Sequence, residues 1–237
     1  MPNPMSSLLK KIMVIAVVAL SVAACSDSTS TDVISTSSKK PTKAATILIF
    51  GDSISQGYGT NNAGIVYQQV TPGKTYAELL RAKIVAENIN QYAPVTVINA
   101  SLGSEYTDEA AYRLPGVLAQ YQPTHVLLAH GTNDAGSDVP NAVIANNLNV
   151  MINQVVGAGA KPLLADVTFT RYGIDTANAY SQMIVNLAAS TGATYVGLLK
   201  GIAGNSTYYL TDGVHLNDLA QPIMLNNLWE KLNPLFD

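Results

Sequence analysis

The sequence predicts an α/β fold, a three-layer α/β/α sandwich around a five-stranded parallel sheet. Three observations lead to this prediction. Short apolar runs of strand length recur from residue 46 onward, they alternate with longer amphipathic stretches, and no internal repeat interrupts the alternation. Strands that are buried on both faces form continuous apolar runs, and strand–helix alternation implies right-handed crossovers.

The apolar runs give the strands of the predicted sheet. They lie at 46–50, 95–99, 125–129, 161–166 and 194–198. Five such strands fit the flavodoxin-like order 2-1-3-4-5, in which the chain reverses direction between the first and third strands. Ligands in such sheets bind outside the carboxyl ends of the strands at this switch point. Polar motifs with a chemical role should therefore gather there.

The amphipathic stretches give the helices. They lie at about 74–90, 107–121, 139–157 and 175–190, and a last one at about 219–233 carries apolar residues at helical spacing. Residues 46–237 form one predicted domain, because roughly 190 residues are enough for a single well-buried core.

Composition excludes several classes of function. Thirteen Lys and Arg residues stand against 16 Asp and Glu, without a long run of either sign, so no nucleic-acid surface is expected. One cysteine and three histidines are poor material for a zinc site. His125 opens the predicted strand at 125–129 and His130 directly follows it, five residues on, so the two should point to opposite faces. We expect no metal, no cofactor and a monomer.

The first 24 residues are predicted to be a signal peptide. Lys10 and Lys11 precede a short apolar stretch that ends in small residues, and this stretch is too short to span a bilayer. The segment ending at Cys25 resembles a bacterial lipobox, which implies that Cys25 is lipidated and becomes the mature N-terminus. The plainer alternative is a spare thiol in a discarded segment. Ser26 after the cysteine resembles an outer-membrane sorting signal, which implies a lipid-anchored protein of the cell envelope, periplasmic or at the surface.

Residues 25–45 are predicted to be the lipidated cysteine and a flexible tether. Residues after Cys25 are rich in Ser and Thr and lack apolar periodicity, so they cannot bury enough surface to fold. About twenty flexible residues have a root-mean-square reach of roughly 25 Å.

A serine follows the first predicted strand in Gly51-Asp-Ser-Ile-Ser55. Alone, Ser53 reads most simply as a turn or helix-cap residue. The segment also differs from the Gly-x-Ser-x-Gly elbow, because Ser55 stands in place of the second glycine. A nucleophile is the alternative interpretation.

An asparagine follows the third predicted strand in Gly131-Thr-Asn-Asp134. Asn133 could belong to an Asx-turn, which is common at such connections. Because strands 1 and 3 are neighbours in the predicted order, about 4.8 Å apart, the Asn133 amide could equally face the crevice of Ser53.

Near the C-terminus, Asp212-Gly-Val-His215 places a carboxylate three residues before an imidazole. The pair could be a helix-entry turn with a surface histidine. Folded back, Asp212 would fix one ring nitrogen of His215 as a donor and leave the other as a base. The preceding loop, 199–211, is long enough to return both residues to the crevice, and irregular loops of that length are unusual without a function.

These three motifs together resemble the GDSL, or SGNH, hydrolase family. Gly51-Asp-Ser-Ile is similar to its GDSL block, Gly131-Thr-Asn-Asp to its asparagine block, and Asp212-x-x-His215 to its final block. The resemblance runs from about residue 47 to the C-terminus and is nearest the bacterial periplasmic thioesterase, lysophospholipase and arylesterase branch. It implies Ser53, Asp212 and His215 as a catalytic triad.

One block departs from the family pattern. The family normally has a glycine after the second strand whose backbone N–H helps to bind the oxyanion. Here an ungapped comparison places Ser104 at that position, with Gly103 one residue earlier. Either residue could serve, and the resemblance implies Ser53, Ser104 and Asn133 as the oxyanion donors.

The expected activity is hydrolysis of short- to medium-chain carboxylic esters through an acyl-enzyme on Ser53. We expect residues 59–73 and 168–174, with Tyr67, Phe169 and Tyr172, to flank the cleft. A carbohydrate O-deacetylase is the first alternative. An inactive ligand-binding lipoprotein of the cell surface is the second.

Overall fold

The computed structural model describes residues 38–60, 66–68, 70–167 and 174–236. The chain divides into two compact units, Met1–Thr36 and Ser37–Asp237. The first unit, with the predicted signal peptide and Cys25, lies outside the described residues.

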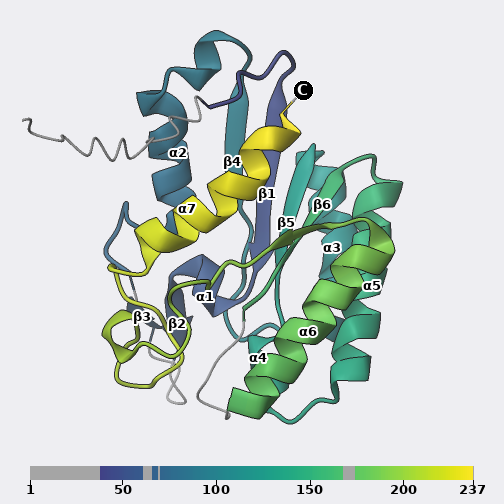
Figure 1. The fold of residues 1–237 in the computed structure, drawn as a ribbon. Coiled ribbons are helices and arrows are strands. Elements are labelled where there is room, and N and C mark those ends of the chain that lie inside the picture. The colour runs from purple at the N-terminus through teal and green to yellow at the C-terminus, as the bar shows by residue number, and fades with distance from the viewer. Residues whose placement is uncertain (1–37, 61–65, 69, 168–173, 237) are drawn as a thin grey trace, which may run out of the picture. The chain divides into compact units, whose positions relative to one another are not determined.

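A five-stranded parallel sheet forms the centre of the second unit, with the order β4-β1-β5-β6-β7 (Figure 1). Its strands are β1 (Ala45–Gly51), β4 (Val95–Asn99), β5 (His125–Ala129), β6 (Lys161–Ala165) and β7 (Thr194–Val196). In sequence order these are strands 2-1-3-4-5, so the predicted topology is confirmed. Ile47 of β1 pairs with Val97 on one side and His125 on the other.

Strand β1 lies deep in the core. Its residues Ile47, Leu48, Ile49 and Phe50 are at most 1% exposed. Burying one such side chain contributes about 1.5–3 kcal/mol. Burial of these apolar side chains holds β1 in the middle of the sheet. It therefore also fixes the position of the segment that follows Gly51.

Five long helices flank the sheet, and their boundaries lie close to the predicted ones. They are α2 (Tyr76–Ala86), α3 (Thr107–Tyr121), α5 (Asn141–Gly157), α6 (Ile174–Thr191) and α7 (Gln221–Leu232). Helices α2 and α7 pack together, and α3, α5 and α6 pack in a row (Figure 1). The two groups cover opposite faces of the sheet, as right-handed crossovers in opposite directions require.

A proline lies inside α3 without ending the helix. Pro115 has no N–H for the carbonyl of Ala111, four residues earlier, and Gln154 of α5 donates to that carbonyl instead (3.0 Å). The neighbouring helix therefore satisfies the acceptor that the proline leaves open.

Several short elements were not predicted. They are α1 (Ser53–Gln56), β2 (Tyr58–Thr60), β3 (Val66–Gln68), α4 (Thr132–Gly136) and the 3₁₀ turns η1 (Ile89–Gln91), η3 (Ser206–Tyr208) and η4 (Asn233–Leu235). The helix expected over 74–90 ends at Ala86, because Asn88 takes a left-handed conformation with φ 53°.

The end of the predicted tether is part of the folded unit. Lys39 donates its N–H to Asn233 Oδ1 (2.8 Å) and accepts from Asn233 Nδ2 (3.1 Å), and Pro41 is buried. The expectation of a flexible chain up to residue 45 is therefore wrong for 38–44, because paired backbone groups hold this stretch on the domain. Among the described residues, no helix has the length and apolar content needed to cross a membrane.

Candidate active site

Ser53 lies at the first position of α1, directly after the carboxyl end of β1. Asp52 caps the helix by accepting from the Ile54 N–H (3.0 Å), and Gly57 ends it with φ 76°. The turn needs glycine at position 51, because a Cβ there would lie 2.9 Å from the carbonyl oxygen of Ala129. Ser53 is 6% exposed, and its Oγ lies 3.0 Å from His215 Nε2.

His215 is oriented by Asp212. His215 Nδ1 lies 2.7 Å from Asp212 Oδ2, while Asp212 Oδ1 accepts from the N–H groups of Val214 (2.8 Å) and His215 (2.9 Å). Burial raises the pKa of Asp212, but the hydrogen bonds from His215 and the two backbone groups outweigh it, so the pKa lies below its usual value. An ionised Asp212 accepts from Nδ1–H, which leaves Nε2 as the acceptor for the Ser53 hydroxyl.

The segment that carries His215 is held as a hairpin against the domain. Tyr209 and Leu216 form an antiparallel bridge, and the Leu210 N–H donates to the His215 carbonyl (2.8 Å). Beyond the histidine, Asp218 accepts from both the N–H (2.8 Å) and the hydroxyl (2.6 Å) of Thr71. The long loop after β7 thus returns Asp212 and His215 to Ser53, as its length indicated.

Ser104 and Gly103 differ in what their backbone N–H groups do. The Gly103 N–H donates to Gln56 Oε1 (2.7 Å). Ser104 has φ 64°, in the left-handed region, and within the described part of the chain its N–H meets no acceptor. Of the two candidates, Ser104 is the residue whose N–H remains available for a ligand.

Asn133 lies in the first turn of α4, directly after the carboxyl end of β5. One hydrogen of its amide is taken by the backbone carbonyl of Glu105 (2.9 Å), which fixes the plane of the side chain and leaves a second hydrogen. Gly131 has φ 123°, and a Cβ there would lie 2.3 Å from the hydroxyl of Tyr180. That hydroxyl donates to the His130 carbonyl (2.8 Å), so Tyr180 packs directly beneath this turn.

The sequence profile of the GDSL-like lipase/acylhydrolase family matches residues 49–221. The chain belongs to this family. Membership makes it a hydrolase of ester bonds, in a family whose general mechanism is acyl transfer through a serine, as the motifs indicated.

Two relatives and one solved structure are similar over most of this acylhydrolase. Esterase TesA of Pseudomonas aeruginosa is 29% identical over 194 residues, which cover 81% of this chain and 90% of TesA. Thioesterase 1/protease 1/lysophospholipase L1 of Escherichia coli is 27% identical over 194 residues, covering 81% and 85%. The psychrotrophic esterase EstA from Pseudoalteromonas sp., in a structure inhibited by monoethylphosphonate, superposes with a TM-score of 0.67 at 27% identity, covering 80% of this chain and 97% of EstA.

The acylhydrolase also has a buried ionic cluster that the sequence did not reveal. Glu105, 3% exposed, accepts from Arg113 Nε (2.5 Å) and Nη2 (2.7 Å), and its Oε2 lies 2.9 Å from Nε2 of the fully buried His130. Burial raises the pKa of Glu105, but hydrogen bonds from Arg113 and His130 outweigh it and hold the pKa below its usual value. In the sequence, His130 stands out only as a poor candidate for a metal ligand, and no local pattern marks Glu105.

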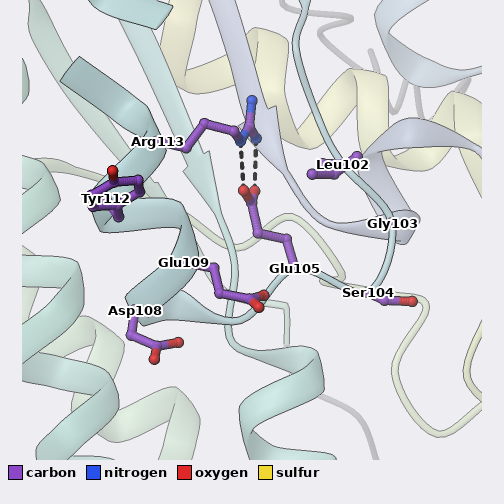
Figure 2. A pocket seen from close by; sticks show the side chains of 8 residues that line it. All are labelled: Leu102, Gly103, Ser104, Glu105, Asp108, Glu109, Tyr112 and Arg113. Atoms are coloured by element: carbon purple, nitrogen blue, oxygen red, sulfur yellow. Dashed lines mark hydrogen bonds and ion pairs between the residues drawn. The ribbon is translucent and has the colours of Figure 1, made fainter. Parts of the chain in front are cut away.

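A cavity of about 770 Å³ opens beside Ser104 (Figure 2). Its lining consists of Leu102, Gly103, Ser104, Glu105, Asp108, Glu109, Tyr112 and Arg113. Three carboxylates against one guanidinium make the lining net negative. Such a lining repels an anionic ligand.

Cys25, Phe169 and Tyr172 lie outside the described residues. Tyr67 lies in β3, but its side chain is not among those described.

Proposed function

We propose that Ser53, His215 and Asp212 are the catalytic triad of this acylhydrolase, and that it cleaves short- to medium-chain carboxylic esters. The single observation that carries the proposal is the continuous hydrogen-bonded line from Ser53 Oγ to His215 Nε2 (3.0 Å) and from His215 Nδ1 to Asp212 Oδ2 (2.7 Å). Three residues from opposite ends of the chain meet at the switch point of the sheet, where α/β proteins bind ligands.

In the acylation step, Ser53 Oγ attacks the ester carbonyl carbon while its proton passes to His215 Nε2. The tetrahedral intermediate collapses as the C–O bond to the alcohol breaks, and His215 returns the proton to the departing alcohol oxygen. A water molecule then repeats the sequence on the acyl-enzyme, which releases the carboxylic acid and restores Ser53. Asp212 stabilises the imidazolium that forms twice in each cycle.

The oxyanion of each tetrahedral intermediate is held by the backbone N–H groups of Ser53 and Ser104 and by the side-chain amide of Asn133. Two observations favour Ser104 over Gly103: the Gly103 N–H is engaged by Gln56, and the Ser104 N–H meets no acceptor within the described part of the chain. Removal of one such donor lowers turnover about 10²- to 10³-fold.

The proposed substrate range rests on the relatives. The similar proteins are named esterase, thioesterase and lysophospholipase. The segments expected to flank the cleft, 59–73 and 168–174, lie partly outside the described residues.

A fluorophosphonate probe tests the triad. We expect covalent labelling of the wild type at Ser53 and of Ser137→Ala, a control serine outside the triad, and no labelling of Ser53→Ala. Hydrolysis of p-nitrophenyl acetate should follow the same pattern. Full activity in Ser53→Ala would overturn the assignment, and a wild type that neither labels nor hydrolyses would indicate an inactive ligand-binding protein.

The acyl range is measured with p-nitrophenyl esters of two to twelve carbons, set against acetate release from acetylated xylan and peptidoglycan. We expect turnover across the short and medium esters. Efficient acetate release, combined with activity on two-carbon esters alone, would instead indicate a carbohydrate O-deacetylase.

We further propose that the acylhydrolase is held in the bacterial cell envelope by lipidation of Cys25. The lipobox-like sequence before Cys25 supports this, and residues 26–37 would remain as a tether with a root-mean-square reach of roughly 20 Å. Wild-type protein should sediment with the outer membrane, whereas Cys25→Ser should appear in the soluble fraction. Equal distribution of the two proteins would exclude the anchor.

A further inference from the structure

Glu105 joins the two loops that carry Ser104 and Asn133. Its side chain reaches from the loop after β4 to Arg113 on α3 (Figure 2) and to His130 at the end of β5. His130 stands three residues before Asn133, and Ser104 is the residue immediately before Glu105. The carboxylate therefore ties the segments of two oxyanion donors to each other.

The backbone of Glu105 makes a second connection between the same segments. Its carbonyl accepts from Asn133 Nδ2 (2.9 Å), so the orientation of the Asn133 amide depends on where this peptide group lies. A shift of the Glu105 main chain would displace the Ser104 N–H and turn the Asn133 amide together. Side chain and backbone of a single residue thus determine the geometry of both donors.

Phe50 connects this cluster to the strand that carries Ser53. The Phe50 ring lies 5.0 Å from the His130 ring, and the Arg113 guanidinium lies 4.3 Å from the Phe50 ring centre. Phe50 is fully buried in β1, three residues before Ser53. The ion pair and this aromatic contact hold the ends of β1, β4 and β5 in one arrangement.

We propose that Glu105 is a positioning residue for the oxyanion hole, which through Arg113 and His130 holds the Ser104 N–H and the Asn133 amide on the developing negative charge. This rests on the proposed function of Ser53, Ser104 and Asn133. Glu105 is 3% exposed and its carboxylate is engaged by Arg113 and His130, so it acts through those donors.

A purely stabilising role explains the cluster less well. Burying an ion pair removes charges from water, and the attraction regained often no more than balances that cost, so a buried pair is weak evidence for stability. Its value lies in fixed geometry, because a bidentate Arg–carboxylate pair allows only one arrangement of its partners. Catalysis needs such precision, since a misplacement of about 1 Å can reduce the rate about 100-fold.

The test compares Glu105→Gln with Asp108→Asn, which removes an exposed carboxylate from the same cavity. Glu105→Gln keeps the side-chain shape but loses the negative charge that forms the ion pair with Arg113. We expect kcat for p-nitrophenyl butyrate to fall roughly 10- to 100-fold with little change in KM, because oxyanion stabilisation acts only in the transition state. Asp108→Asn should match the wild type in both constants.

A double-mutant cycle separates positioning from general destabilisation. If Glu105 acts through Asn133 and Ser104, Glu105→Gln should cost clearly less in an Asn133→Ala background, by a factor of about three or more. Equal losses in both backgrounds, or a loss that falls on KM alone, would overturn the proposal. Arg113→Lys keeps the positive charge and loses the bidentate hydrogen bonding, so it should reproduce the kcat loss. It replaces Glu105→Gln in the test if that variant folds poorly.

Labelling by the fluorophosphonate probe separates a failure of the positioning role from a failure of the proposed triad. Labelling of wild type and Glu105→Gln by the fluorophosphonate probe reports Ser53 directly. A labelled, active wild type with an unimpaired Glu105→Gln variant would refute the positioning role alone. A wild type without labelling or turnover would refute the triad.

Discussion

Ser104 takes a backbone conformation that ordinary residues avoid. A left-handed φ brings Cβ close to the following carbonyl oxygen and costs roughly 1–2 kcal/mol for a residue other than glycine. The strain is maintained by the contacts around it, including the hydrogen bond from Gly103 to Gln56 and the anchoring of Glu105. Such strain commonly accompanies functional sites, where it presents a backbone group to a ligand.

Ser104→Gly should relieve this strain and leave the N–H in place. We expect the free energy of unfolding to rise by roughly 0.5–1 kcal/mol, with kcat/KM within about twofold of the wild type. Urea denaturation and p-nitrophenyl butyrate kinetics measure both quantities. Ser104→Ala is the matched control, because it removes the hydroxyl and retains the strain; a large activity loss in both variants would mean that the hydroxyl itself has a role.

The lowered pKa of Glu105 links its ion pair to stability in acid. Because the carboxyl pKa is lower in the folded chain than the usual 4.5, the unfolded chain binds protons first as the pH falls. The stabilisation is complete above about pH 4.5 and is lost as the pH drops through the folded pKa. We therefore expect Glu105→Gln to be less stable than the wild type by about 2–3 kcal/mol at neutral pH.

The difference in the free energy of unfolding between the wild type and Glu105→Gln should shrink steadily as the pH is lowered below 4.5. Urea denaturation at a series of pH values measures it, with Asp108→Asn as the exposed control. A difference that stays constant down to pH 3 would show that the carboxylate charge contributes nothing to stability.

At the scale of elements, helix α3 persists through a proline because α5 lies beside it. Gln154 donates to the Ala111 carbonyl that Pro115 leaves without a helical partner. Gln154→Leu should lower the free energy of unfolding by about 1–3 kcal/mol, because a partly buried carbonyl is then left unsatisfied. In a Pro115→Ala background the helix supplies its own N–H, so the same substitution should cost much less; equal costs in both backgrounds, measured by urea denaturation, would contradict this account.

The elements that could be predicted are those long enough to show a period. The five parallel strands are continuous apolar runs, and the five long helices carry apolar faces, so their places and order follow from the sequence. The one-turn helices α1 and α4 are too short to show a helical period. Strands β2 and β3 have three residues each, and pairing between them, which no local pattern reveals, defines them.

The positions of the candidate site residues could also be predicted. Ser53, Asn133, Asp212 and His215 each follow a strand or a return loop, so the topology places them at one edge of the sheet, while their roles were inferred from the family resemblance. The choice between Gly103 and Ser104 needed a backbone angle and a hydrogen bond. Glu105, Arg113 and His130 come from three separate segments, and their contacts with one another exist only in the folded chain.

At the scale of the whole molecule, the folded unit begins before its first strand. Asn233, just after α7, forms two hydrogen bonds with the main chain of Lys39, and Lys40 lies 4.5 Å from the centre of the Tyr92 ring. These contacts lie at the amino end of β1, whereas Ser53 follows its carboxyl end. Seven residues of extended strand separate the two ends by about 20 Å, so the contacts should support stability without affecting catalysis.

Two truncated proteins test this separation. A protein starting at residue 38 keeps the contacts of Lys39 and Lys40, and one starting at residue 45 lacks them. We expect the shorter protein to be less stable by about 1–3 kcal/mol in urea denaturation, since two hydrogen bonds and a buried Pro41 are lost. Both should hydrolyse p-nitrophenyl butyrate with the same kcat/KM.

Asn233→Ala provides the control that assigns the loss to these contacts. In the longer protein it should reproduce a large part of the destabilisation, because its amide bonds both the N–H and the carbonyl of Lys39. In the shorter protein its partners are already gone, so the same substitution should change stability by only a few tenths of a kcal/mol. If it destabilised both proteins equally, Asn233 would act within the C-terminal turn, and residues 38–44 would belong to the tether after all.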